Sequence, residues 1–181
     1  MLNFSAPSFS RELFLQKTQG KRVVLIYPWS NLKTLFLSAF LDKARDGLLY
    51  YRVTQESSNL VDWIDSLVTE FRGILGKKFG AETAAALKDR KPAQVGEALA
   101  SDLGKISSDP LILYLDDVDR VTYEDEFAQW ATAFIKALPA HVQVVVSARV
   151  LSRHPWDAFV SSGEAVVIGV ETRRNNVVFT S

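Results

Sequence analysis

Short runs of apolar residues recur along this chain without polar alternation, separated by longer segments of helical periodicity. Unbroken apolar runs of this length are typical of parallel strands that are buried on both faces. They predict strands over 22–27, 48–53, 111–115, 142–146, 165–170 and 176–180. The run LILYL at 111–115 is the strongest of them.

Between these runs, apolar residues at spacings of three and four predict amphipathic helices. The segment 59–74 carries six apolar residues on one helical face, namely Leu60, Trp63, Ile64, Leu67, Val68 and Phe71. Ser57 or Ser58 is its expected N-terminal cap. Further helices are expected over 32–41, 127–138, 156–160 and 81–103, the last with interruptions near Pro92 and Gly96.

Strands that alternate with helices predict an α/β fold, a three-layer sandwich with a mainly parallel sheet. Residues 1–181 are close to the usual size of one domain. Ligands of such sheets bind beyond the carboxyl ends of the strands. Segments 28–34, 116–119 and 147–149 are therefore where a site is expected.

The amino-acid composition argues against several classes of function and cellular location. Lysine plus arginine number 21 and aspartate plus glutamate number 21, so no net charge attracts nucleic acid or an anionic membrane. The absence of cysteine excludes disulfides and thiolate metal sites. Residues 1–14 lack the pattern of a signal peptide, and no apolar run reaches transmembrane length. We therefore expect a cytoplasmic protein with no membrane partner.

The first candidate site is the Lys33-Thr34 pair at the start of the helix that follows the first strand. In a P-loop, glycines let backbone N–H groups wrap the phosphates, lysine reaches them, and the hydroxyl holds magnesium. Ser30 and Asn31 belong to the same loop, but Tyr27 and Leu32 stand where the glycines should be. We expect nucleotide binding to be weakened or lost. The alternative is that Lys33 and Thr34 are a solvated first helical turn.

The second candidate is the pair of acids that ends the strongest strand. Asp116 is the expected magnesium ligand, together with Thr34 if nucleotide binds, and Asp117 is the candidate catalytic residue that orients water. The alternative is a helix-capping acid pair, with Asp119 as a turn residue.

The third candidate is Arg149, which follows the strand at 142–146 together with Ser147. A guanidinium at this place is suited to sensing a γ-phosphate. Alternatively, Arg149 pairs with Asp116 or Asp117 and only neutralises them. The two histidines, His141 and His154, lack metal-ligand spacing and are expected at the surface.

In order and spacing, these motifs resemble the N-terminal nucleotide-binding domain of the STAND signalling ATPases, particularly bacterial transcription activators of the maltose-regulator, LuxR-like type. The similar stretches are GKRVVLIYPWSNLKTLFLSAFLD at 20–42, LLYYRVTQESSNLVDWIDSLVTEF at 48–71, LILYLDDVDRV at 111–121, PAHVQVVVSARVLSRHPW at 139–156 and NVVFT at 176–180. Lys33 and Thr34 match the Walker A pair, Asp116 and Asp117 the Walker B acids, and Arg149 the sensor.

The resemblance implies a P-loop NTPase-like, AAA/STAND-type core with ATP or ADP and magnesium as ligands. It also implies that residues 1–181 are one domain of a longer transcriptional regulator, in which nucleotide biases a signalling switch. Partners are then other domains of the regulator, other proteins or a second copy, and DNA is bound only through a domain absent here. Because the Walker A glycines are replaced, we expect no ATP hydrolysis.

An alternative function is that of a pseudo-ATPase without cofactor, acting only as a structural or protein-interaction module. Its old site would be filled by Leu32 and Trp29 and closed by a salt bridge between Arg149 and Asp116.

Overall fold

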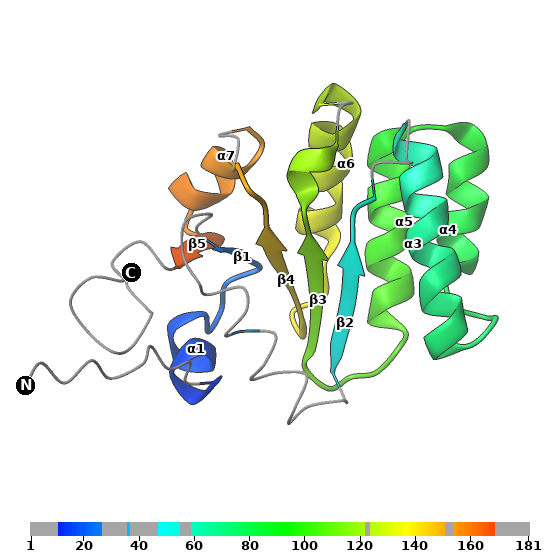
Figure 1. Cartoon of the computed structure of the whole chain (residues 1–181). Helices are drawn as coiled ribbons and strands as arrows, with labels where there is room; N and C mark the ends of the chain where they lie inside the picture. Colours follow the sequence, from blue (N-terminus) through cyan, green and yellow to red (C-terminus); the bar gives the residue numbers. More distant parts are fainter. Residues whose placement is uncertain are drawn as a thin grey trace, which may run out of the picture.

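The computed structural model describes residues 11–26, 36, 47–54, 59–121, 124–150 and 154–168. These residues contain one five-stranded sheet, ordered β2-β3-β4-β1-β5, in which all four neighbouring pairs are parallel (Figure 1). The strands are β1 (Val23–Ile26), β2 (Leu48–Arg52), β3 (Leu111–Asp116), β4 (Val142–Ser147) and β5 (Ala165–Ile168). The predicted parallel α/β sheet is confirmed.

Six α-helices lie within the described ranges: α1 (Arg11–Lys17), α3 (Leu60–Leu75), α4 (Ala81–Ala86), α5 (Pro92–Gly104), α6 (Glu124–Ala137) and α7 (Trp156–Ser161). Two short 3₁₀ turns, η1 (Leu87–Asp89) and η2 (Val118–Arg120), complete the order. Among the described helices, none has the length and apolar character needed to cross a membrane.

The sheet is buried on both faces, which explains why its strands show no polar alternation. Successive residues of a strand enter two different apolar clusters, as Val23 and Val24 of β1 do. The first cluster contains residues of α3, α5, α6 and α7. The second contains Phe14 of α1 together with Phe36. Helical residues thus cover both sides of the sheet, and the predicted three layers are confirmed.

The strand order fixes which connection covers which face. The chain passes from β1 over β4 and β3 to reach β2, and then returns through β3 and β4 to β5. Because crossovers between parallel strands are right-handed, opposite directions place the connections on opposite faces. Phe36, in the connection from β1 to β2, accordingly lies across the sheet from α3, α5 and α6. The order reverses at β1 and β4, which is where ligands of open α/β sheets bind.

Two details differ from the sequence-based expectations, namely the cap of α3 and the role of Gly96, whereas the interruption expected near Pro92 is confirmed. Asn59, rather than Ser57 or Ser58, caps α3, because its side chain accepts the N–H of Asp62 at 3.0 Å. Gly96 does not interrupt the helical segment but lies inside α5. The break falls before Pro92, which opens α5.

Helix α1 was not expected. Phe14 is its only fully buried residue, so its sequence has too little apolar periodicity to signal a helix. The helix predicted over 32–41 lies outside the described residues except for Phe36, which is helical. The strand predicted over 176–180 also lies outside them.

Arg22 joins the entrance of β1 to the end of α6. Its Nη1 donates to the main-chain oxygens of Ile135, Lys136 and Leu138 at 2.9, 3.0 and 3.1 Å. The last carbonyls of a helix have no partner within the helix, and a cation there also interacts favourably with the helix dipole. Arg22 therefore caps α6 from a neighbouring strand.

Candidate functional site

The carboxyl ends of the central strands bring polar side chains into one row. Arg52 at the end of β2 is paired in register with Asp116 at the end of β3. Ser147, the last residue of β4, is paired with Ile26, the last residue of β1. The chain thus leaves β1 beside Ser147 and Asp116, at the point where the strand order reverses.

Asp116 is the buried centre of this row, with only 1% of its surface exposed. Its Oδ2 accepts the hydroxyl of Tyr50 and its Oδ1 accepts the hydroxyl of Ser147, both at 2.6 Å. Hydroxyl-to-carboxylate bonds of this length are among the stronger hydrogen bonds in proteins. Two neighbouring strands therefore fix the orientation of the Asp116 carboxylate.

Asp117 is held differently, by cations. Its backbone is left-handed, with φ of 56° and ψ of 39°, a conformation that aspartate tolerates better than most residues. Its Oδ2 lies 2.7 Å from Nε of Arg52 and 3.3 Å from Nε of Arg120. A carboxylate between two guanidinium groups is a poor proton acceptor, because both charges favour its ionised form.

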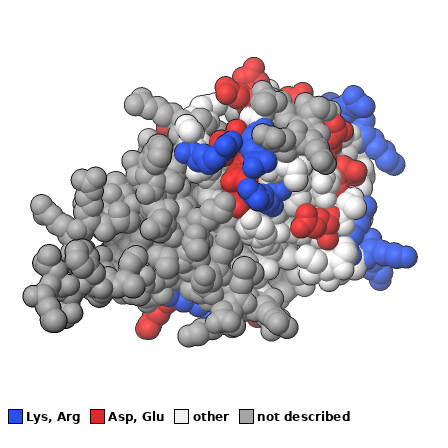
Figure 2. All heavy atoms as spheres, viewed as in Figure 1, with Lys and Arg blue, Asp and Glu red and all other residues white. Residues whose placement is uncertain are grey.

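Arg149 is 69% exposed at the side chain and pairs with Asp119. Its Nε lies 3.1 Å from Oδ2 of Asp119, and its backbone N–H donates to Oδ1 at 3.1 Å. The suggested pairing of Arg149 with Asp116 or Asp117 is therefore wrong, because the turn after β3 presents Asp119 first. Figure 2 shows basic and acidic side chains next to one another on the upper part of the visible face, toward which β2, β3 and β4 point in Figure 1.

Phe36 links this edge to the connection that follows β1. Its ring lies 5.1 Å from that of Tyr114 and 5.1 Å from that of Phe14, measured between centroids. Tyr114 stands two residues before Asp116, so both side chains point to the same face of β3. Phe36 therefore packs under the face of the sheet that carries the Asp116 carboxylate.

The structure thus describes three of the predicted site residues and places two of them, Asp116 and Asp117, at the same strand end. Ser30, Asn31, Lys33 and Thr34 lie outside the described residues, as do Tyr27, Trp29 and Leu32. Sequence reasoning missed Tyr50, Arg52 and Arg120. Tyr50 and Arg52 are two residues apart on β2, but only the strand order shows that β2 lies beside the strand that carries Asp116.

No family model matches this sequence, and no curated protein is significantly similar to it. Solved structures are similar in fold. Two are chains from Drosophila ORC bound to Cdc6 and to AT-rich or GC-rich DNA, with TM-scores of 0.53 and 0.51 and 13% identity each. A third, from Drosophila ORC bound to DNA, has a TM-score of 0.50 and 12% identity.

Each of these alignments covers 86% of this chain, but the chain spans only half the length of the first two relatives and 83% of the third. At this identity the similarity concerns the fold alone. The sheet order and these similar structures together indicate the fold class. This chain has a P-loop NTPase-like fold.

A P-loop NTPase-like fold implies nucleotide and magnesium, and the described residues allow a test of the fit. Within the described ranges, no group of three or more acidic, histidine or cysteine side chains could hold a metal unaided. Magnesium usually keeps several waters and takes one or two protein carboxylates plus phosphate oxygens. Asp116 fits that role through a bound water, since both of its oxygens already accept hydroxyl protons. Asp117 is instead paired with Arg52 and Arg120.

The tyrosines of β2 and β3 predict that the folded chain loses stability at alkaline pH. Burial, and then the hydrogen bond to Asp116, raise the pKa of Tyr50, while burial raises the pKa of Tyr51 and of Tyr114. All three stay protonated in the folded chain above about pH 10, where an unfolded chain loses those protons. Stability that is fully present below about pH 10 is therefore lost as the pH rises above it.

We expect the melting temperature to fall steeply between about pH 10 and about pH 12, and to fall less in a Tyr50→Phe, Tyr114→Phe double variant. Absorbance of tyrosinate, followed with circular dichroism, measures this. Of the five tyrosines, these three should ionise only as the fold is lost. Ionisation of all five near pH 10, with the circular dichroism unchanged, would contradict the expectation.

Proposed function

We propose that this domain is a nucleotide-binding-derived regulatory domain, which binds ATP or ADP weakly at the carboxyl edge of its sheet and does not hydrolyse it. The observation that carries the proposal is the packing of Phe36 against Tyr114. Phe36 follows the Lys33-Thr34 pair by two residues, and Tyr114 precedes Asp116 by two. This supports a Walker A pair and a Walker B acid that share one face of a P-loop NTPase-like sheet.

In the proposed site, Lys33, Thr34, Ser30 and Asn31 bind the phosphates, and Arg149 meets the terminal one. Asp116 and Thr34 would hold the magnesium ion, which neutralises phosphate charge when bound. The exposure of Arg149 allows it to exchange Asp119 for a phosphate, because a surface ion pair is weak. Leu32 and Tyr27 in place of glycines lower the affinity.

We expect no turnover of ATP, because Asp117 is held by two arginines. Asp117 would have to orient or deprotonate water, and its Oδ2 is already paired with Arg52 and Arg120. Binding without hydrolysis suits a switch in a longer signalling protein. We therefore propose a signal-transduction role in a cytoplasmic STAND-type transcriptional regulator, with protein partners or the other domains of the same regulator as its readers.

Titration calorimetry with ATP, with and without magnesium, tests the proposal. Asp116→Asn should weaken binding of magnesium-ATP about tenfold and leave metal-free ATP unchanged, since it removes one charge beside the ion. Lys33→Ala should weaken both. Asp65→Asn, which removes the same charge from an exposed position of α3, is the matched control and should change neither.

The outcomes that overturn nucleotide binding are equally concrete. If neither ATP nor ADP releases or absorbs heat at high protein concentration, or if Lys33→Ala binds as the unaltered chain does, the site does not bind nucleotide. Steady release of phosphate that requires Asp117 would instead refute the absence of turnover.

The second candidate function is a pseudo-ATPase used as a structural or protein-interaction module. This function is favoured by the fact that both acids already have partners within the chain. Tyr50 and Ser147 donate hydrogen bonds to Asp116, and two arginines form ion pairs with Asp117. It predicts no ATP binding and a loss of stability in Asp116→Asn. The similar structures are of ORC bound to DNA, but the net charge of zero gives direct DNA binding by this chain no electrostatic support.

A further inference from the structure

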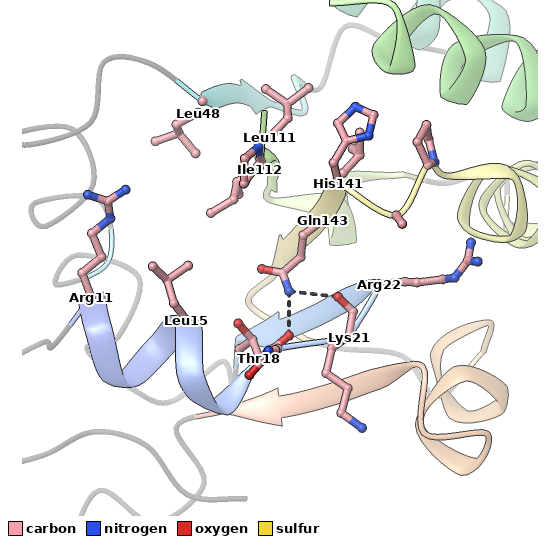
Figure 3. A pocket seen from close by; sticks show the side chains of 17 residues that line it. Arg11, Leu15, Thr18, Lys21, Arg22, Leu48, Leu111, Ile112, His141 and Gln143 are labelled. Atoms are coloured by element: carbon pink, nitrogen blue, oxygen red, sulfur yellow. Dashed lines mark hydrogen bonds between the residues drawn. The ribbon is translucent and has the colours of Figure 1, made fainter. Parts of the chain in front are cut away.

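A hollow lies at the edge of the sheet where the strands begin, opposite the proposed nucleotide site. It is a cavity of about 630 Å³ between α1 and the starts of β1, β2, β3 and β4, called here the amino-edge cavity (Figure 3). Its size falls within the range of small-molecule sites, about 300 to 1,000 Å³. No residue of the proposed nucleotide site is among its described lining residues.

One side of the amino-edge cavity is apolar. Leu48 and Ile112 line it from the sheet, and Leu15 of α1 points toward them across the space (Figure 3). Leu15 is 45% exposed, which is unusual for a large apolar side chain that faces a cavity wall of the same kind. A ligand with an apolar body would cover Leu15 and gain hydrophobic free energy in proportion to the area covered.

The basic side chains of the lining already have contacts within the chain. Lys21 Nζ donates to the carbonyl of Gly163 at 2.6 Å, and Arg22 donates to the last carbonyls of α6. Arg11 likewise has an interaction of its own. An anionic ligand would have to replace one of these contacts. A cationic ligand would meet only like charges, because no aspartate or glutamate is among the described lining residues. The lining therefore suits a molecule without charge.

Gln143 supplies a hydrogen-bond acceptor to the amino-edge cavity. Its Nε2 donates to the carbonyls of Thr18 and Lys21 at 3.0 and 2.9 Å (Figure 3). Because only the nitrogen of an amide can donate to two carbonyls, these contacts identify the other atom as the oxygen. That Oε1 points to the side of the cavity on which Leu15 lies, and no described residue donates to it. A ligand with one donor group can therefore be bound there.

We propose that the amino-edge cavity binds a small neutral molecule with an apolar body and one hydrogen-bond donor, such as an aromatic alcohol. The body packs between Leu15 and Leu48, and the donor group bonds to Oε1 of Gln143. The site is independent of the nucleotide proposed for the carboxyl edge, so each can be tested without the other.

The probe for this site is N-phenyl-1-naphthylamine, a neutral apolar molecule with one N–H donor whose fluorescence rises in apolar surroundings. The folded chain should bind it saturably at one site, and 2-naphthol should displace it, whereas ATP should not. In 2-methoxynaphthalene a methyl group replaces the donated proton, so this ether should compete about tenfold less well than 2-naphthol. The anion 2-naphthoate should compete no better than the ether.

Leu15→Gln tests the apolar wall. It should weaken binding of the probe about tenfold, because the ligand then covers a polar side chain in place of an apolar one. Ile74→Gln is the matched control, since it makes the same kind of exchange at an apolar residue of α3 that is 67% exposed. This control should leave binding unchanged.

Gln143→Met tests the acceptor. The exchange also removes the hydrogen bonds to Thr18 and Lys21, so a lower overall affinity alone could reflect a looser fold. The informative quantity is the ratio between the affinities for 2-naphthol and 2-methoxynaphthalene. This ratio should fall from about ten to about one, because neither ligand can then bond to the side chain.

Four results would overturn the proposal. Two concern the place of binding, namely fluorescence that does not saturate, and binding by Leu15→Gln at the level of the Ile74→Gln control. A preference of the unaltered chain for 2-naphthoate over 2-naphthol would refute a neutral ligand. Equal competition by 2-naphthol and its ether in the unaltered chain, or an unchanged ratio in Gln143→Met, would refute the acceptor. Circular dichroism of each variant confirms that the comparison concerns folded protein, and the ligand pair on the unaltered chain decides even if Gln143→Met does not fold.

Discussion

Replacing Gly96 with alanine is expected to lower the free energy of unfolding by about 3 kcal/mol. A Cβ at this position of α5 would lie 2.6 Å from the main-chain oxygen of Trp130 and 2.9 Å from the main-chain nitrogen of Phe134. Both atoms belong to the backbone of α6, so a side chain cannot rotate away to make room. Helices α5 and α6 would have to separate, at the expense of their shared apolar contact.

Urea unfolding followed by tryptophan fluorescence measures this effect, because Trp130 lies in the α5–α6 contact. Gly73→Ala is the matched control, since a Cβ at this exposed position of α3 would meet no atom within 4 Å. There the higher helix propensity of alanine should raise stability by about 0.5 to 1 kcal/mol. Two glycine-to-alanine changes of opposite sign would establish the close approach, and two changes of the same sign would contradict it.

Replacing Asp102 with alanine is expected to cost about 2 to 3 kcal/mol. Helix α4 begins after Gly80, which has no side chain to cap it. Asp102 of α5 supplies the cap instead, because its Oδ2 accepts the backbone N–H of Thr83 at 2.8 Å and the hydroxyl of Thr83 at 2.7 Å. The variant would leave both buried donors without a partner.

Thermal and urea denaturation of Asp102→Ala, Asp102→Asn and Thr83→Ala, with the Asp102→Ala, Thr83→Ala double variant, measure this contribution. Asparagine keeps an acceptor oxygen, so Asp102→Asn should cost less than half as much as Asp102→Ala. The double variant should cost less than the sum of the two single ones, because the residues share one interaction. Additive costs, or an asparagine variant as unstable as the alanine one, would show that Asp102 acts in another way.

The sequence allowed the parallel sheet to be predicted because burial on both faces leaves a strong local signal. Unbroken apolar runs such as that ending at Leu115 exist only where no strand face meets solvent. The place of Asp116 was predictable for the same reason, since a carboxylate directly after such a run must lie at a strand end. Both inferences need only residues that are neighbours in the chain.

The partners of Asp116 and Asp117 were not predictable, because they depend on which strands are neighbours. Tyr50 is 66 residues from Asp116, and Arg52 is 65 residues from Asp117. Local patterns place both on a strand but say nothing of the strand beside it. The same limit explains the wrong partner suggested for Arg149.

Gly96 and Asn59 show how tertiary packing overrides local preference. Glycine weakens an isolated helix, so Gly96 suggested a break, but its missing side chain is what lets α5 approach α6. Ser57, Ser58 and Asn59 are all good caps. Asn59 is used because Leu60, directly after it, is buried in the core.

The contact of Arg22 with the end of α6 makes this helix a connection between the two edges of the sheet. Helix α6 has 14 residues, a rod about 21 Å long. Its last carbonyls are held by Arg22 at the edge where the strands begin, and its first residue lies four positions after Arg120, which contacts Asp117. Helix α6 is therefore a rigid connection between the point where β1 begins and the turn that carries Arg120.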